Sequence, residues 1–73
     1  MKYSVLLFYK YIHIDNLDDL LKSQREICER LNLKGRTIIA KEGINSTLGG
    51  LSENIHKYIE YMNGLDLAKN FIW

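Results

Sequence analysis

The sequence predicts an α+β sandwich in which two helices cover one face of an antiparallel sheet. Two observations carry this prediction. Strand-like stretches alternate with two amphipathic helical patterns in the order β-α-β-β-α-β, and turn residues separate the elements. Two split βαβ units joined by a hairpin form such a sandwich, and right-handed crossovers place both helices on the same face. The 73 residues allow one domain, so the fold is expected to span residues 1–73.

The first strand is predicted over residues 3–12, which are rich in aromatic and β-branched residues and contain no glycine or proline. Both of its faces are largely apolar, which predicts a central strand covered on both sides. Asp15 or Asn16 is expected to cap the helix that follows, and Gly35 to end it in a left-handed conformation. The apolar stripe of this helix has helical spacing and consists of Leu17, Leu20, Leu21, Gln24, Ile27, Cys28 and Leu31.

The second half of the chain repeats this pattern. Strands are predicted at about residues 36–40 and 46–49, with a tight turn at residues 42–45 between them. Ser52 is expected to cap a second helix that ends at Asn63 and Gly64. Residues 71–73 resemble the start of a fourth strand, which completes a ferredoxin-like (acylphosphatase-like) sandwich with a truncated last strand.

The fourth strand of this topology pairs with the first, so a short fourth strand leaves a long apolar edge that proteins normally avoid. We therefore expect the natural chain to continue beyond Trp73, which makes this sequence the N-terminal part of a longer protein. The alternative is a complete domain that ends on a short strand.

Composition narrows the class of protein. A net charge of +1 argues against a strongly basic nucleic-acid-binding module but leaves room for a local basic patch. No apolar run approaches the roughly 18 residues that a membrane span needs. The single cysteine, Cys28, excludes an internal disulfide and favours a reducing compartment, so a cytoplasmic location is expected.

None of the reactive residue types forms a recognisable catalytic or metal-binding set. Cys28 lies on the apolar stripe of the first helix and is expected to be part of the core. His13 and His56 are far apart in sequence and are expected at the surface, because a zinc site needs about four ligands. The aspartates near the start of the first helix are explained by capping and by the helix dipole; they are Asp15, Asp18 and Asp19. We therefore expect no catalytic residue, metal or cofactor in this domain.

Two functions known for related folds do not fit the residues. Acylphosphatases hold phosphate with an arginine-bearing loop after the first strand, and residues 10–15 contain neither an arginine nor a glycine-rich loop. RNA-binding domains of related topology stack bases on aromatic residues of two central strands, and residues 46–49 contain no aromatic residue. Packing against a second domain therefore explains the apolar sheet face better than that RNA-binding motif does.

The turn between the two middle strands is the strongest candidate for a functional contact. Gly43 permits a positive φ, Asn45 can hydrogen-bond to the local backbone, and Glu42 can accept from exposed amides. On these residues alone, an ordinary hairpin turn is the better explanation. In the functional interpretation, the turn and the neighbouring basic residues contact nucleic acid or another domain; these candidates are Lys34, Arg36, Lys41, Glu42, Gly43 and Asn45.

The sequence around this turn closely resembles the N-terminal domain of the rhodanese-related tRNA uridine hydroxylases. The resemblance covers essentially the whole chain. Its most specific part is the turn with its flanks, and the matching segments are Phe8-Tyr9-Lys10-Tyr11, Lys34-Gly35, Ala40-Lys41-Glu42-Gly43-Ile44-Asn45 and Leu48-Gly49-Gly50.

The resemblance implies a cytoplasmic parent protein, an oxidoreductase that hydroxylates the wobble uridine of tRNA. The catalytic cysteine of that family lies in a rhodanese domain downstream, and no residue of this chain matches it. The implied role is therefore an accessory domain that packs on the rhodanese domain and helps bind tRNA. The alternative is a stand-alone interaction or regulatory domain without a nucleic-acid role. An uncovered sheet face or edge also makes self-association possible.

Overall fold

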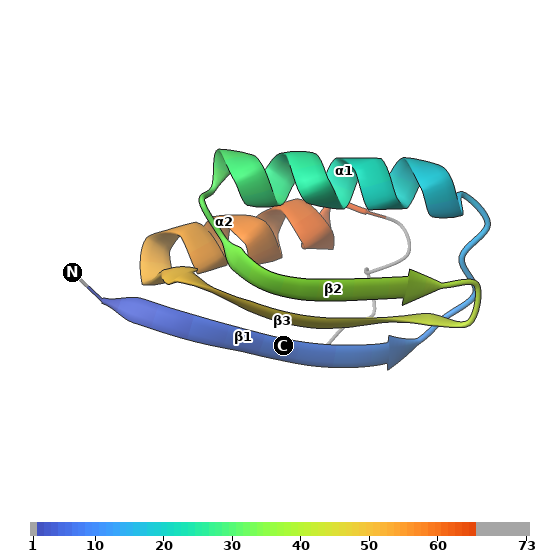
Figure 1. The fold of residues 1–73 in the computed structure, drawn as a ribbon, viewed down its shortest axis with the longest axis horizontal. Coiled ribbons are helices and arrows are strands. Elements are labelled where there is room, and N and C mark those ends of the chain that lie inside the picture. The colour runs from blue at the N-terminus through green and yellow to red at the C-terminus, as the bar shows by residue number, and fades with distance from the viewer. Residues whose placement is uncertain (1, 66–73) are drawn as a thin grey trace.

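The computed structural model describes residues 2–65, which form three strands and two helices. The elements follow the order β1 (Tyr3–Tyr11), α1 (Leu17–Arg30), β2 (Lys34–Ala40), β3 (Gly43–Leu51) and α2 (Ser52–Asn63). Both helices lie on the same side of the sheet (Figure 1). This arrangement confirms the predicted α+β sandwich, and the predicted strand at residues 71–73 lies outside the described residues.

Strand β3 lies in the middle of the sheet and pairs antiparallel with both neighbours, in the order β1-β3-β2. Its long pairing with β1 runs from Tyr3 opposite Leu51 to Tyr11 opposite Gly43. Within residues 2–65, β1 therefore lies at an edge, and one of its faces is exposed. The prediction of a central strand covered on both sides is wrong for this part of the chain, because apolar residues on both faces do not specify the pairing.

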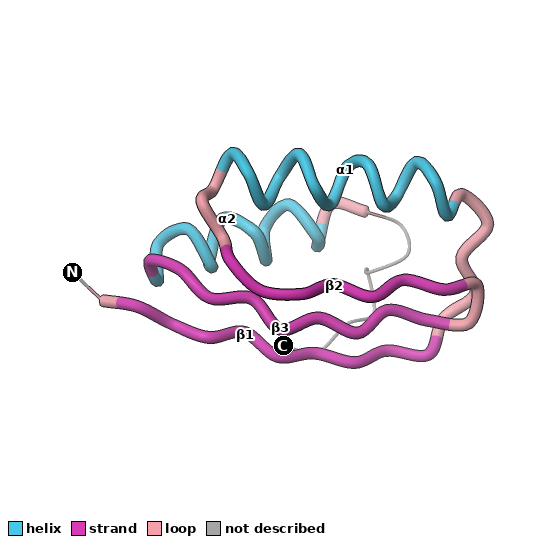
Figure 2. Tube along the Cα trace, in the orientation of Figure 1, coloured by secondary structure: helices cyan, strands magenta, loops and turns pink. Residues whose placement is uncertain are grey.

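The core lies between the sheet and the two helices. Helix α1 packs over β2, and α2 packs over β1 and β3 (Figure 2). The inner residues of β3 alternate with outward residues, as expected for a strand with one covered face. The buried apolar residues are Phe8, Ile14, Leu20, Ile27, Leu33, Ile44, Leu48, Ile55, Tyr58 and Met62. Cys28 packs against this cluster, as predicted.

Helix α1 ends differently from the prediction. Its last helical residue is Arg30, and Asn32 takes the left-handed conformation with φ 52°. Gly35 instead lies inside β2 with φ 140°, where a Cβ atom would lie 1.9 Å from the carbonyl oxygen of Thr47. Asparagine tolerates the left-handed region well, so it can end a helix where glycine was expected.

Neither helix is capped by the side chain that the sequence indicates. Asn16 is the N-cap residue of α1 but forms no side-chain cap hydrogen bond, and the Asp15 carboxylate accepts from His13 instead, at 2.6 Å. Ser52 is the first residue of α2, and its hydroxyl forms a hydrogen bond with Ser4 of β1. These side chains join neighbouring segments of the chain instead of satisfying the first helical amides.

Buried polar groups form hydrogen bonds between the two helices and on the inner face of the sheet. The Tyr58 hydroxyl donates to Gln24 Oε1 at 2.6 Å, and Gln24 Nε2 donates to Met62 Sδ at 3.1 Å. On the sheet side, the hydroxyls of Thr37 and Ser46 lie 2.9 Å apart. Among the described residues, every buried side-chain nitrogen and oxygen has a hydrogen-bond partner.

Burial raises the pKa of the Tyr58 phenol, and the Cys28 thiol acts in the same direction, while a hydrogen bond from Ser46 opposes both. Burial also raises the pKa of the Cys28 thiol. Both groups are therefore protonated at neutral pH, and the phenol of Tyr58 serves as a hydrogen-bond donor.

We predict that Gly35→Ala destabilises the fold by about 1–3 kcal/mol, because the new methyl group meets the Thr47 carbonyl and the positive φ disfavours alanine. Gly49→Ala is the matched control, since the nearest atom to a Cβ there lies 3.8 Å away. Urea unfolding followed by circular dichroism measures both variants. Equal free energies of unfolding for the two would contradict the proposed backbone strain.

We also predict that Tyr58→Phe lowers the free energy of unfolding by about 1–3 kcal/mol, because Gln24 Oε1 loses its buried donor. Combining it with Gln24→Leu should cost less than the sum of the two single changes, since both polar partners are then removed. Tyr61→Phe, at a half-buried position on the same helix, serves as the control. Strict additivity in this double-mutant cycle would argue against the hydrogen bond.

Candidate functional site

The sheet surface that faces away from the helices carries an exposed apolar row. Five alternate residues of β1 point to this side, and their exposed fractions range from 54% at Tyr9 to 76% at Tyr3 and Tyr11. Ile38 of β2 is also 53% exposed. We call this surface the open face. It consists of Tyr3, Val5, Leu7, Tyr9 and Tyr11 from β1, Lys34, Arg36, Ile38 and Ala40 from β2, and Gly43, Asn45, Thr47 and Gly49 from β3.

The strand register sets the order of side chains across the open face, because directly paired residues of an antiparallel sheet point to the same side. Arg36 and Leu7 flank Thr47, and Lys34 and Val5 flank Gly49. Nearer the hairpin, Ile38 and Tyr9 flank Asn45, and Ala40 and Tyr11 flank Gly43. The middle strand thus presents small or polar residues between an apolar row on β1 and a partly basic row on β2.

A hollow of about 150 Å³ lies where this face meets the hairpin. We call it the hairpin hollow. Aromatic and aliphatic side chains form most of its wall, and Asn45 and Glu42 add a carboxamide and a carboxylate. Its lining residues are Tyr9, Tyr11, Ile38, Ala40, Glu42, Gly43, Ile44 and Asn45.

The two aromatic rings of the hollow contact each other. The ring centroids of Tyr9 and Tyr11 lie 4.9 Å apart with an interplanar angle of 81°, an edge-to-face pair. A hydrogen bond with Tyr11 raises the pKa of the Tyr9 phenol, and the negative charge of Glu42 contributes in the same direction. Tyr9 is thus a neutral, exposed aromatic group beside a carboxylate.

The hairpin turn is shorter than predicted and is tied to the chain that leaves β1. Lys41 and Glu42 form the turn, whereas Gly43 and Asn45 already belong to β3. The carbonyl oxygens of Glu42 and Lys41 accept hydrogen bonds from Ile12 at 3.1 Å and Ile14 at 2.9 Å. These bonds anchor the turn and hold Glu42 at the rim of the hollow.

Gly43 is required by close packing of the backbone, not by an unusual conformation. Its φ is not in the left-handed region, contrary to the reason for which the sequence favoured glycine. A Cβ atom at this position would lie 2.4 Å from the carbonyl oxygen of Lys10. The absence of a side chain therefore lets β3 approach β1 at the end of the sheet.

The structure divides the six predicted contact residues into two groups. Glu42, Gly43 and Asn45 line the hairpin hollow. Lys34 and Arg36 lie on the same face farther along β2, while Lys41 is exposed in the turn and does not line the hollow.

Tyr9, Tyr11 and Ile38 also belong to this site, although the sequence did not predict them as members. The tyrosines were visible as one of two apolar rows, but the sequence did not specify which row faces outward. The register with β3 supplies that information, since it places Tyr9 beside Asn45.

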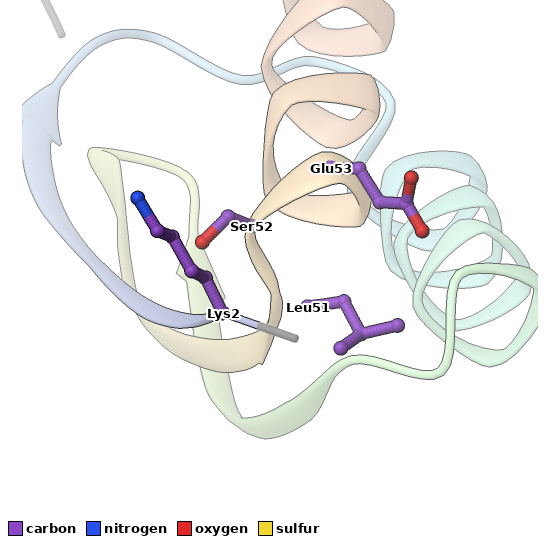
Figure 3. Close-up of a pocket in the computed structure, with 4 residues that line it drawn as sticks. All are labelled: Lys2, Leu51, Ser52 and Glu53. Carbon is purple, nitrogen blue, oxygen red and sulfur yellow. The ribbon is translucent and has the colours of Figure 1, made fainter.

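A second pocket lies at the opposite end of the sheet, where Lys2, Leu51, Ser52 and Glu53 line a space of about 330 Å³ (Figure 3). In this view the Lys2 and Glu53 side chains point in opposite directions, so their charges do not converge. The backbone amide of Ser52 donates to the Lys2 carbonyl at 2.9 Å. The polar groups here thus connect β1 to the start of α2.

Neither histidine lines the hairpin hollow. His13 is exposed and pairs with Asp15, while His56 is exposed on α2, as predicted. No group of three or more histidine, cysteine, aspartate or glutamate residues in this range is placed to hold a metal ion. Neither described helix is long and apolar enough to cross a membrane.

Comparison with known proteins gives one family and a consistent set of relatives. The family model described as the UPF0176 acylphosphatase-like domain matches residues 3–73. A protein named tRNA uridine(34) hydroxylase from Enterococcus faecalis is 50% identical over 70 residues, which are 96% of this chain and 22% of the relative. A protein of the same name from Staphylococcus haemolyticus is 48% identical over 86% of this chain and 20% of its own length. Another from Staphylococcus carnosus is 45% identical over 96% of this chain and 22% of its own length.

The chain thus spans about a fifth of the length of these relatives. No solved structure matches it. The family description agrees with the α+β sandwich formed by the three strands and two helices. Since the family model extends over nearly the entire sequence, this chain belongs to the UPF0176 acylphosphatase-like domain family.

Proposed function

We propose that this chain is the accessory N-terminal domain of a tRNA-modifying protein, which packs on a catalytic domain and helps hold the tRNA. The observation that carries the proposal is the 50% identity over 96% of the chain to a protein named tRNA uridine(34) hydroxylase. The relatives are more than four times as long as the chain, so most of each relative is available to carry the chemistry.

In this proposal the catalytic residues lie outside the chain. The neighbouring domain is of rhodanese type, it hydroxylates the wobble uridine, and the protein works in the cytoplasm. The free thiol of Cys28 lies on the helical side of the sheet and packs against the core. The accessory domain needs no cofactor of its own for a role in binding.

The two sides of the open face suit two different contacts. Val5 and Leu7 form an exposed aliphatic stretch, which is favourable to bury against a neighbouring domain. Lys34 and Arg36 lie across the sheet from them on β2, and both are exposed. Two cations beside a flat surface are suited to backbone phosphates, which dominate the affinity of proteins for nucleic acid.

A stand-alone protein-interaction domain is the second candidate, because Val5 and Leu7 can serve any apolar partner. That alternative assigns no role to the basic residues of β2. The two candidates therefore differ in whether charge on the open face affects binding of tRNA.

Replacing Lys34 and Arg36 with alanine should weaken tRNA binding and flatten its dependence on salt. Each lost phosphate contact is expected to reduce the slope of log affinity against log salt by about 0.7–0.9. The matched control is Lys22→Ala with Lys57→Ala, which removes two exposed cations from the helices. Filter binding between 50 mM and 200 mM salt measures the slopes. Equal slopes for the two double variants would exclude a specific role of β2.

The domain contact can be tested by chimera. We expect this chain to replace the matching 70 residues of the Enterococcus faecalis relative with retention of tRNA hydroxylation. Leu7→Asp should reduce that activity at least several-fold, because it places a charge in an apolar interface. His56→Asp introduces an aspartate at an exposed position on the helical side and should have little effect. If Leu7→Asp left the hydroxylation activity of the chimera unchanged, packing through the open face would be contradicted.

A further inference from the structure

The hairpin hollow differs from the rest of the open face in its chemistry. Toward the N-terminal end of β1 the exposed side chains are aliphatic, as at Val5 and Leu7. At the hairpin end, aromatic rings stand beside hydrogen-bonding groups of Asn45 and Glu42. An apolar protein surface would leave those polar groups without partners, at a cost in free energy.

The side chains that line the hollow are complementary to the face and the edge of a nucleobase. The exposed ring of Tyr9 offers a surface for stacking, and its edge-to-face contact with Tyr11 holds it in place. The Asn45 carboxamide can both donate and accept a hydrogen bond, whereas the Glu42 carboxylate accepts N–H donors. Bases carry such donors and acceptors together along one edge.

Size and charge indicate how much of a nucleotide the hollow can take. A volume of about 150 Å³ is below the roughly 300 Å³ of ordinary ligand pockets, so it suits one planar ring and leaves sugar and phosphate outside. The Glu42 carboxylate repels phosphate from the hollow. On the open face, Arg36 is the next outward residue after Ile38 along β2, and Lys34 is the one after it.

We propose that the hairpin hollow binds one unpaired base of a single-stranded RNA segment, which stacks on Tyr9 and hydrogen-bonds to Asn45. The RNA backbone then runs along β2, where Arg36 and Lys34 face its phosphates. This inference rests on the proposed role in tRNA binding and deepens it by specifying an unpaired segment as the ligand. It also separates the RNA contact from the aliphatic stretch at Val5 and Leu7.

This site is distinct from the aromatic motif that the sequence lacks. In that motif the stacking residues lie on two central strands. Here both rings come from β1, two residues apart, and the middle strand contributes the hydrogen-bonding Asn45 instead. One base per domain is therefore expected, in place of a row of stacked bases.

Fluorescence anisotropy with labelled RNA hexamers of uridine, adenosine or cytidine, and with a duplex RNA of equal charge, tests the proposal on this chain. We expect the hexamers to bind more tightly than the duplex. Tyr9→Ala should weaken hexamer binding by roughly 5- to 150-fold, since stacking on one aromatic ring contributes about 1–3 kcal/mol per base. Tyr9→Phe should retain affinity within about twofold.

Two further variants complete the test. Tyr3→Ala removes a tyrosine that is more exposed than Tyr9, at the far end of β1, and should leave binding unchanged. Asn45→Ala should change the ratio of affinities among the three hexamers, because it removes the group that contacts the base edge. Circular dichroism verifies that every variant is folded.

Three results would overturn the proposal: no binding of any hexamer at low salt, equal affinity for hexamers and duplex, or equal losses from Tyr9→Ala and Tyr3→Ala. The accessory role in hydroxylation is judged separately by the chimera. If the chimera is active and Tyr9→Ala does not change its tRNA binding, the base site alone is excluded. If the chimera folds correctly but is inactive, the proposed function is excluded.

Discussion

Strand β3 is paired along both of its edges, and its register with β1 and β2 determines which side chains face the helices and which face outward. Ile44, Ser46 and Leu48 are buried, while Asn45 and Thr47, which alternate with them, are exposed. A shift by one residue would exchange these two sets. The core and the open face therefore depend on the same set of backbone hydrogen bonds.

Close backbone packing and buried polar groups both support this register. Gly43 allows β3 to approach the Lys10 carbonyl, and Gly35 allows β2 to approach the carbonyl of Thr47. Ser46 then links the sheet to α2 through Tyr58, and Tyr58 links α2 to Gln24 of α1. A slipped register would leave these buried polar groups without partners, which costs more than the loss of an apolar contact.

The sequence was sufficient for the order of the five elements among residues 2–65 and for the family resemblance. Each depends on local patterns, such as helical spacing in α1 and α2 or the glycines around the hairpin. Strand order was harder to predict from the sequence, because β1 is apolar on both faces and strand pairing depends on long-range contacts. The helix end at Asn32 and the two-residue turn were missed because several residue types tolerate the same backbone conformation.

In the candidate site, too, local features were predictable from the sequence and long-range contacts were not. Glu42, Gly43 and Asn45 are adjacent in sequence, so their association was predictable, whereas Tyr9 joins them only through the pairing of β1 with β3. Lys41 was included for its position in the sequence, but the structure places it outside the hollow. Pairing between strands, which local pattern does not specify, thus decides the membership of the site.

The central proposal is that the hairpin hollow and the outward cations of β2 together form the contact surface for RNA. The most direct measurement is the side-chain amide spectrum of the ¹⁵N-labelled chain during titration with a single-stranded RNA hexamer. Asn45 reports on the open face, and Gln24, buried between the helices, reports on the opposite side. The account predicts that the Asn45 side-chain resonances shift while those of Gln24 stay constant. A shift confined to Gln24 and the helices, or no shift at either position, would contradict it.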